Sequence, residues 1–145
     1  MINRNDTQTF WQKRLVDNIA SMTFGLTDIA WPNVDFDHDG KDLWVRMTFL
    51  PVGEEKTSFG RLGCLGMTEF VRIEVFAKRG GSTGPAKEAA KLLGDLFYAG
   101  FSATDSGIAL YILRNEPFDS GQFDATWHRE TVQFLYSARS RLETL

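Results

Sequence analysis

The first hydrophobic pattern in the chain has the three-to-four-residue spacing of an α-helix. It runs from residue 7 to residue 22, and its hydrophobic positions are Phe10, Trp11, Leu15, Ile19 and Met22. Residues at this spacing line one side of a helix, so the stretch predicts an amphipathic helix with one buried stripe. Asp6 or Thr7 is available as its N-cap, because a short polar side chain accepts a hydrogen bond from a free backbone N–H group.

Beyond this helix, hydrophobic and polar residues alternate, as they do in β-strands with one buried face. Residues 29–34 predict a short strand, which Pro32 confines to a sheet edge or a strand end because proline lacks the N–H donor. Longer alternating stretches predict further strands at residues 43–51, 68–78, 108–114 and 125–139. The charged, aperiodic residues 51–61 predict a long exposed loop.

A second helical pattern occupies residues 85–100. Pro85 suits the first helical position, and Gly100 suits the C-terminal cap. The buried stripe of this helix consists of Ala89, Leu92, Leu93, Leu96 and Phe97. A polar loop separates it from the strand predicted at residues 108–114.

The elements follow the order α-β-β-β-α-β-β in a single domain that spans residues 1–145. This order predicts an α+β fold, a single mostly antiparallel sheet of four or five strands with both helices packed on one face. The opposite face of the sheet would be polar, with some aromatic interruptions. Its predicted members are Arg46, Arg72, Glu74, Thr131 and Gln133, together with Trp44, Phe70 and Phe76.

Composition narrows the classes of function. The formal net charge of −3 lacks the basic excess of proteins that bind nucleic acid through its phosphates. The single cysteine, Cys64, excludes a disulfide within the chain and fits a reducing compartment. No signal-peptide pattern and no run of eighteen apolar residues occurs, so we expect a soluble protein without a membrane segment.

The segment VDFDHDG contains the start of a possible calcium loop, in which Asp35, Asp37 and Asp39 alternate before Gly40. An EF-hand loop requires a bidentate glutamate at its twelfth position, and that position is Arg46. The segment therefore predicts a solvated acidic turn, with a calcium loop of another DxDxDG type as the alternative.

The Gly-rich loop between a predicted strand and the second helix, RGGSTGPAK, lies where phosphate-binding loops occur. A Walker loop needs a lysine and a hydroxyl residue directly after its last glycine, whereas Gly84 is followed by Pro85. Pro85 also removes a backbone donor that a phosphate would need. We therefore predict a simple loop, with Ser82 or Thr83 near the helix cap, rather than a nucleotide site.

Residues capable of catalysis are few. His38 and His128 are the only histidines, and together with Cys64 they provide too few ligands for a structural zinc site within one chain. No spacing in the sequence links either histidine to Cys64 as a nucleophile and base. We predict no enzyme, no catalytic or metal-binding residues and no cofactor.

The residues that we select as a candidate assembly surface have mixed charges and include an aromatic ring, which suits a subunit interface. They are Trp44, Arg46, Arg72, Glu74, Arg129 and Glu130. The alternative interpretation is an ordinary solvated sheet face.

The order of motifs resembles that of phage tail terminator, or tail-completion, proteins and related prophage-encoded domains. A helix is followed by a W-x-N-x-x-F segment (Trp31, Asn33, Phe36) and a W-x-R-x-x-x-x-P strand (Trp44, Arg46, Pro51). A further strand, a Gly-rich loop and a helix then precede the closing strand, and that helix ends in Leu-x-x-x-Phe, which is Leu93 and Phe97 here. These short motifs cover most of the chain.

The resemblance implies a virion structural protein of the tail, present in the bacterial host cytoplasm during assembly. It implies a ring, possibly a hexamer and in some cases formed only on assembly, that caps the tail tube and joins the tail to the head. The implied partners are further copies, the tail-tube protein and a head-completion protein, without specific nucleic-acid binding and without a membrane. Loops at residues 51–66 and 78–84 are candidates for ordering on assembly.

Two other functions remain open at this point. One is a metal- or nucleotide-binding enzyme that uses the turn at residues 35–39 or the loop at residues 80–84. The other is a monomeric head–tail joining module.

Overall fold

The structure is a computed structural model that describes residues 2–56 and 64–141. These residues form two α-helices, two short 3-10 helices and one sheet. The helices are α1 (Arg4–Asp17), η1 (Ile19–Ser21), η2 (Leu26–Asp28) and α2 (Gly84–Leu96). The strands are β1 (Ile29–Ala30), β2 (Leu43–Lys56), β3 (Cys64–Lys78), β4 (Ser102–Asp105), β5 (Ile108–Gln122) and β6 (Trp127–Arg141).

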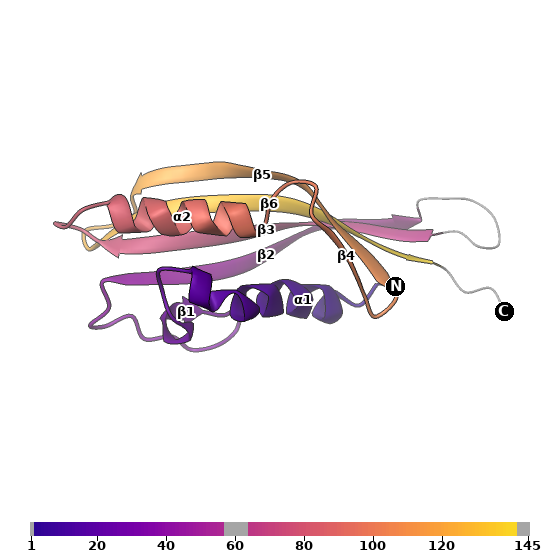
Figure 1. Ribbon diagram of the computed structural model, residues 1–145, viewed down its shortest axis with the longest axis horizontal. Coiled ribbons are helices and arrows are strands. Elements are labelled where there is room, and N and C mark those ends of the chain that lie inside the picture. The colour runs from indigo at the N-terminus through magenta and orange to yellow at the C-terminus, as the bar shows by residue number, and fades with distance from the viewer. Residues whose placement is uncertain (1, 57–63, 142–145) are drawn as a thin grey trace.

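The described residues form a sheet of six strands in the order β1-β2-β3-β6-β5-β4. β1 runs parallel to β2, and every other neighbouring pair is antiparallel. The long strands twist strongly along their length (Figure 1). The predicted single, mostly antiparallel sheet of four or five strands in the order α-β-β-β-α-β-β is therefore wrong: the sheet has six strands and is mixed.

The missed strand and the parallel pair have separate physical reasons. β4 is mostly exposed, so it shows no hydrophobic alternation. Its conformation comes from a tight turn to β5, in which Ser106 (φ 52°) and Gly107 (φ 76°) both have the positive φ typical of a type I′ hairpin. β1 contains two residues, and alternation along a strand carries no information about whether its neighbour is parallel.

β2, β3 and β5 are longer than their hydrophobic patterns predicted. β2 continues to Lys56 and β3 begins at Cys64, so residues 51–56 form strand where a loop was predicted. A register shift between Pro51 and Gly53 interrupts the alternation at this point, and two similar shifts interrupt β5. Residues 57–61 of the predicted loop lie outside the described residues.

The helix ends also differ from the prediction. Asn3, not Asp6 or Thr7, caps α1: its side chain accepts a hydrogen bond of 2.9 Å from the backbone N–H of Asn5. Pro85 occupies the first turn of α2 as predicted. Gly100 does not cap α2; it has φ +95° and donates its N–H to the carbonyl of Ile112, at 2.8 Å, which fixes the connection to β5.

Both helices cover the same face of the sheet, because their buried residues belong to one hydrophobic core. The core includes Trp11 and Leu15 from α1, Ala89 and Leu93 from α2, and Val45, Met47, Ile73, Phe134 and Tyr136 from the strands. The guanidinium of Arg14 donates to the carbonyl of Leu96 at 3.1 and 2.8 Å and thereby joins the ends of the two helices. In the described part of the chain, no helix is both long enough and apolar enough to span a membrane.

Candidate assembly surfaces

The outer face of the sheet, opposite the helices, carries a line of charges across four strands. Glu74 of β3 is buried, with 4% of its surface exposed. It accepts two hydrogen bonds from Arg46 of β2, at 2.9 and 3.1 Å, and one of 3.1 Å from Arg129 of β6. Arg129 also donates to Asp119 of β5. The two arginines and two carboxylates neutralise one another and hold a fixed geometry across the sheet.

Next to these charges lies an aromatic cluster on the same face. Trp44 stacks on Phe76 with ring centroids 4.1 Å apart, and Trp127 meets Trp44 edge-on at 5.9 Å. The chain between β1 and β2 folds over this cluster. His38 stacks on Trp44 at 5.2 Å and Phe36 lies at 5.3 Å, so Trp44 is buried within the chain and is not available to a partner.

The structure therefore separates the six residues that we selected. Arg46, Glu74 and Arg129 form one network. Trp44 lies under the 31–42 segment, and Arg72 is on the outer face, where it donates to Gln133 at 3.1 Å. Glu130 points to the opposite face.

On the helix-covered face, Glu130 is buried and has two polar neighbours. It accepts a hydrogen bond from the hydroxyl of Ser120, and its carboxylate lies 3.1 Å from the His128 ring nitrogen Nε2. Directly opposite residues of neighbouring strands share a face, and Ser120 pairs with Glu130 in the register of β5 and β6. Glu130 thus belongs to a second surface, which lies between α2 and the strands β5 and β6.

The segment VDFDHDG (residues 34–40) lies in an exposed turn that continues to residue 42, and we call residues 34–42 the acidic loop. Asp39 donates its N–H to the Asp37 carboxylate at 2.9 Å, and Gly40 has φ +78°. Lys41 points away to Asp28, at 2.9 Å. Among the described residues, no three His, Cys, Asp or Glu side chains gather in a way that would hold a metal ion.

The ion pair between Lys41 and Asp28 fixes the base of the acidic loop. Partial burial of Asp28 acts to raise the pKa of its carboxyl. The hydrogen bonds from the Gly25 N–H and from Lys41, with the charge of Lys41, outweigh burial and hold this pKa below its ordinary value.

The Gly-rich loop before α2, which we considered as a possible phosphate site, forms the start of the helix. Ser82 rather than Thr83 supplies the side-chain oxygen at the start of α2, since its hydroxyl accepts from the N–H of Gly84 at 3.1 Å. Pro85 follows at once, in the first turn of the helix. The side chain of Cys64 lies outside the described part of the structure.

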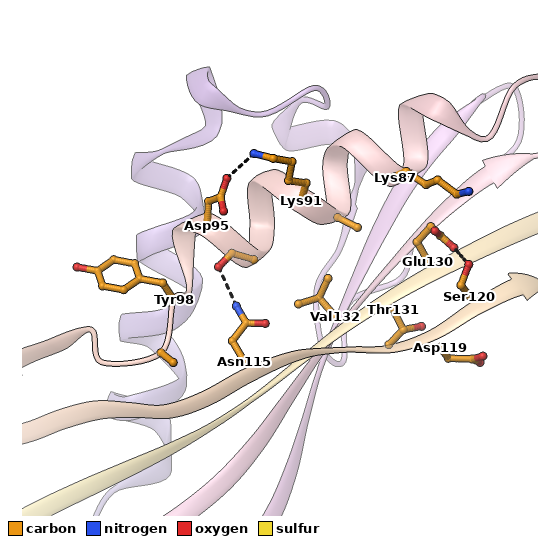
Figure 2. A pocket seen from close by; sticks show the side chains of 13 residues that line it. Lys87, Lys91, Asp95, Tyr98, Asn115, Asp119, Ser120, Glu130, Thr131 and Val132 are labelled. Carbon is orange, nitrogen blue, oxygen red and sulfur yellow. Dashed lines mark hydrogen bonds and ion pairs between the residues drawn. The ribbon is translucent and has the colours of Figure 1, made fainter.

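A groove between α2 and the strands β5 and β6 was not predicted from the sequence; we call it the α2 groove (Figure 2). Its volume is about 770 Å³, and its lining comprises Lys87, Ala90, Lys91, Gly94, Asp95, Tyr98, Ala99, Asn115, Asp119, Ser120, Glu130, Thr131 and Val132. Asn115 of β5 donates to the carbonyls of Gly94 and Phe97, both at 2.8 Å, and so holds the helix in place. Figure 2 shows Lys87 and Glu130 at one end of this groove.

A buried polar network under α1 was also missed. Glu69 of β3 has no exposed surface, although it lies among core residues. The hydroxyl of Tyr136 donates to Glu69 at 2.7 Å and lies 3.0 Å from the hydroxyl of Thr7, while Gln8 donates to Glu69 at 3.3 Å. Burial, together with the negative charge of Glu69, raises the pKa of Tyr136 far above its ordinary value. The sequence did contain a sign that Glu69 is buried. Glu69 has the same parity as Val71 and Ile73, so the alternation of β3 places all three on the same face.

Comparison with known proteins assigns this chain to a family. Residues 12–136 match the family model described as phage tail terminator protein. No curated protein matches the sequence. Nine chains of solved structures match the fold, and one of them, at 16% sequence identity, has a TM-score of 0.73 over 95% of this chain and 96% of its own.

At that identity, the solved structure supports the fold alone. The family match covers most of the chain and agrees with the resemblance in the order of motifs. The family consists of structural components of the phage tail. The chain belongs to the phage tail terminator family.

Proposed function

We propose that this protein forms a ring, a hexamer on the pattern that the resemblance implies, which caps the tail tube and joins the tail to the head. The observation that carries the proposal is the family match over residues 12–136. Its partners would be further copies of the chain, the tail-tube protein and a head-completion protein. DNA would pass through the ring without specific recognition, in keeping with the net charge of −3.

The shape of the sheet supports a head-to-tail ring. A cyclic ring larger than a dimer joins two different patches of the same subunit, and the two edges of this sheet are different. At one edge, β1 pairs with two residues of β2. At the other edge, β4 pairs with β5 from Ile108 to Tyr111.

Large apolar side chains are exposed near both edges. Val16, Leu26 and Val34 lie around a groove beside β1, and Tyr98, Tyr111 and Leu113 lie beside β4, β5 and the end of α2. Exposed apolar groups that gather in patches favour contact with another protein. Pro51 and Pro117 stand next to register shifts in β2 and β5, which disfavours direct strand pairing between copies, so we expect side chains to make the contact.

The outer face is the surface proposed to meet the tube or the head. Arg46, Arg72 and Arg129 are its partly exposed members. The buried Glu74 fixes the positions of Arg46 and Arg129, and Gln133 holds Arg72. A planar guanidinium that is already held by hydrogen bonds loses little freedom when a partner binds.

The test is assembly with the tail-tube protein encoded in the same phage genome. Tubes polymerised with this protein are expected to stop growing, and electron microscopy is expected to show one ring on the tube end. Tubes incubated without it are expected to keep lengthening under the same conditions. Tubes of equal length in both samples, with no ring on their ends, would disprove the proposed function.

A further inference from the structure

We propose that the outer face of the sheet binds a carboxylate-bearing surface at the end of the tail tube, and that Glu74 is the positioning residue for this contact. The inference rests on the proposed function, and it adds the chemistry of the partner and the way in which the arginines are presented to it. Glu74 itself is too buried to touch the partner, with 4% of its surface exposed.

At its surface, the outer face of the three central strands presents positive charges. Directly opposite residues of neighbouring strands share a face. The register of β2, β3 and β6 places four cations on the same side as Glu74, which are Arg46, Arg72, Lys78 and Arg129. All four are at least partly exposed. Over residues 43–50, 68–78 and 127–137, Glu74 is the one carboxylate on this side, and it is buried. A partner that approaches these strands therefore meets cations.

The neighbouring parts of the chain do not cancel this charge. On the same side, β5 adds Arg114, Glu116 and Asp119, so that the face has five cations and three carboxylates in a chain of net charge −3. The acidic loop borders the face, but within the described part of the chain the ion pairs of Arg46 and Arg129 join them to Glu74 and Asp119 and not to the loop. An acidic surface is the electrostatic complement of this face.

The two arginines of the network keep hydrogen-bond donors for a partner. Arg46 donates from Nε and Nη2 to Glu74, and Arg129 donates from Nη1 to Glu74 and from Nη2 to Asp119. Nη1 of Arg46 and Nε of Arg129 make no hydrogen bond to the described residues. The two side chains are 41% and 25% exposed. A guanidinium has no acceptor atom, so the unused N–H groups need acceptors, and carboxylates form the strongest such bonds.

Glu74 and two aromatic rings fix these guanidinium groups before any partner arrives. One carboxylate holds both arginines, so neither can change rotamer without losing a charge-assisted hydrogen bond. The guanidinium of Arg46 lies over the ring of Phe76 at 5.2 Å, and that of Arg129 lies over Phe123 at 4.9 Å. A site that is already formed binds at a lower entropic cost. Glu74 thus lowers the charge of the face but improves its geometry.

A row of apolar side chains beside the arginines favours a protein partner over a nucleic acid. Leu50, Phe70 and Leu135 lie opposite one another on β2, β3 and β6, and each is partly exposed. Arg114 of β5 lies over the ring of Phe70 at 5.7 Å. Arginine next to apolar groups is typical of protein interfaces, whereas a phosphate backbone is held by polar and cationic groups. The proposed function requires contact with the tube end for capping, so we assign this face to the tube.

The experiment measures how tightly variants cap tubes built from the tail-tube protein of the same phage genome, at low and at moderate salt. Arg46→Gln removes one guanidinium and is expected to weaken capping by roughly tenfold or more at low salt. Arg46→Lys keeps the charge but lacks the planar fork, so it is expected to weaken capping nearly as much. Wild-type capping should weaken as salt rises, and capping by Arg46→Gln should depend less on salt.

Glu74→Gln tests the positioning role through the sign of its effect. It makes the face more positive, so it would strengthen capping if the arginines acted through charge alone. We expect weaker capping that still depends on salt, because both arginines stay charged but lose the carboxylate that fixes them. Thermal melting should show that the variant is folded at the assay temperature. Stronger capping by Glu74→Gln would overturn the positioning role.

The matched control is Lys87→Gln, which removes an exposed cation on the helix-covered side and is expected to cap like the wild type. If the wild type caps tubes and both Arg46 variants cap equally well, the inference is wrong and the proposed function stands. Arg46 variants that cap normally but no longer join heads would also overturn it, because the face would then bind the head. Retention of a duplex DNA fragment by the wild type but not by Arg46→Gln would overturn it as well, since the face would then bind phosphate. If the wild type caps no tubes, both proposals fail.

Discussion

The Trp11→Ala variant is expected to lose about 3–5 kcal/mol of unfolding free energy, because it removes the largest side chain at the centre of the core. Trp11 has no exposed surface and makes edge-on contacts with rings from the end of α2 and from β6. Its ring centroid lies 6.1 Å from that of Phe97, 5.7 Å from that of Phe134 and 5.2 Å from that of Tyr136. Alanine would leave a cavity where α1 and the C-terminal end of α2 meet the sheet. A loss of this size is a large fraction of the stability of an ordinary domain.

Urea unfolding followed by circular dichroism measures this loss without depending on tryptophan fluorescence. The control is Val16→Ala in the same helix, whose side chain is 37% exposed and whose replacement is expected to change the unfolding free energy by less than about 0.5 kcal/mol. If Trp11→Ala cost no more than Val16→Ala, α1 would not be packed on the sheet as described.

The packing of α1 was predictable because it depends on local spacing. Trp11 and Leu15 are four residues apart, and a helix places them on one side whatever the rest of the chain does. The face of β3 was predictable for the same reason, since Ile73 lies between Arg72 and Glu74. The spacing within one segment does not show which strands pair with one another. The six-strand order and the parallel contact of β1 depend on segments distant in sequence.

The candidate surfaces also combine features that one segment predicts with features that depend on pairing between distant segments. Arg46, Glu74 and Arg129 could be assigned to the polar face of their strands, but their mutual contact depends on the register of β2, β3 and β6. We grouped Glu130 with them, although it has the same parity as Val132 and Phe134, which face the helices. The alternation of β6 therefore already placed Glu130 on the helix-covered face. The α2 groove is different, because its lining comes from a helix and two strands that no local pattern relates.

The polar network under α1 leads to the second large expected effect. Tyr136→Phe is expected to cost about 1–3 kcal/mol, since it removes the nearest donor to a fully buried carboxylate. Among the described residues, Glu69 would keep only the weaker contacts with Gln8, at 3.3 and 3.5 Å, and with Arg4, at 3.8 Å. A buried charge that loses a hydrogen bond cannot recover it from water. The matched control is Tyr111→Phe, whose exposed hydroxyl can be hydrated and whose removal should have little effect.

The same substitution should change how stability depends on pH, and the sign follows from the pKa of Tyr136. Burial raises this pKa in the folded protein, so the folded state retains the phenol proton at a pH where the unfolded chain releases it. The stabilisation is fully present below the ordinary tyrosine pKa of about 10, and it declines above that value by up to about 1.4 kcal/mol per pH unit. Tyr136→Phe has no such proton to lose, so its deficit relative to the Tyr111→Phe control should shrink as the pH rises. Urea unfolding at several values between roughly pH 8 and pH 11 measures this trend. A deficit that stayed constant or grew over that range would show that the Tyr136 hydroxyl is not held in the buried contact with Glu69.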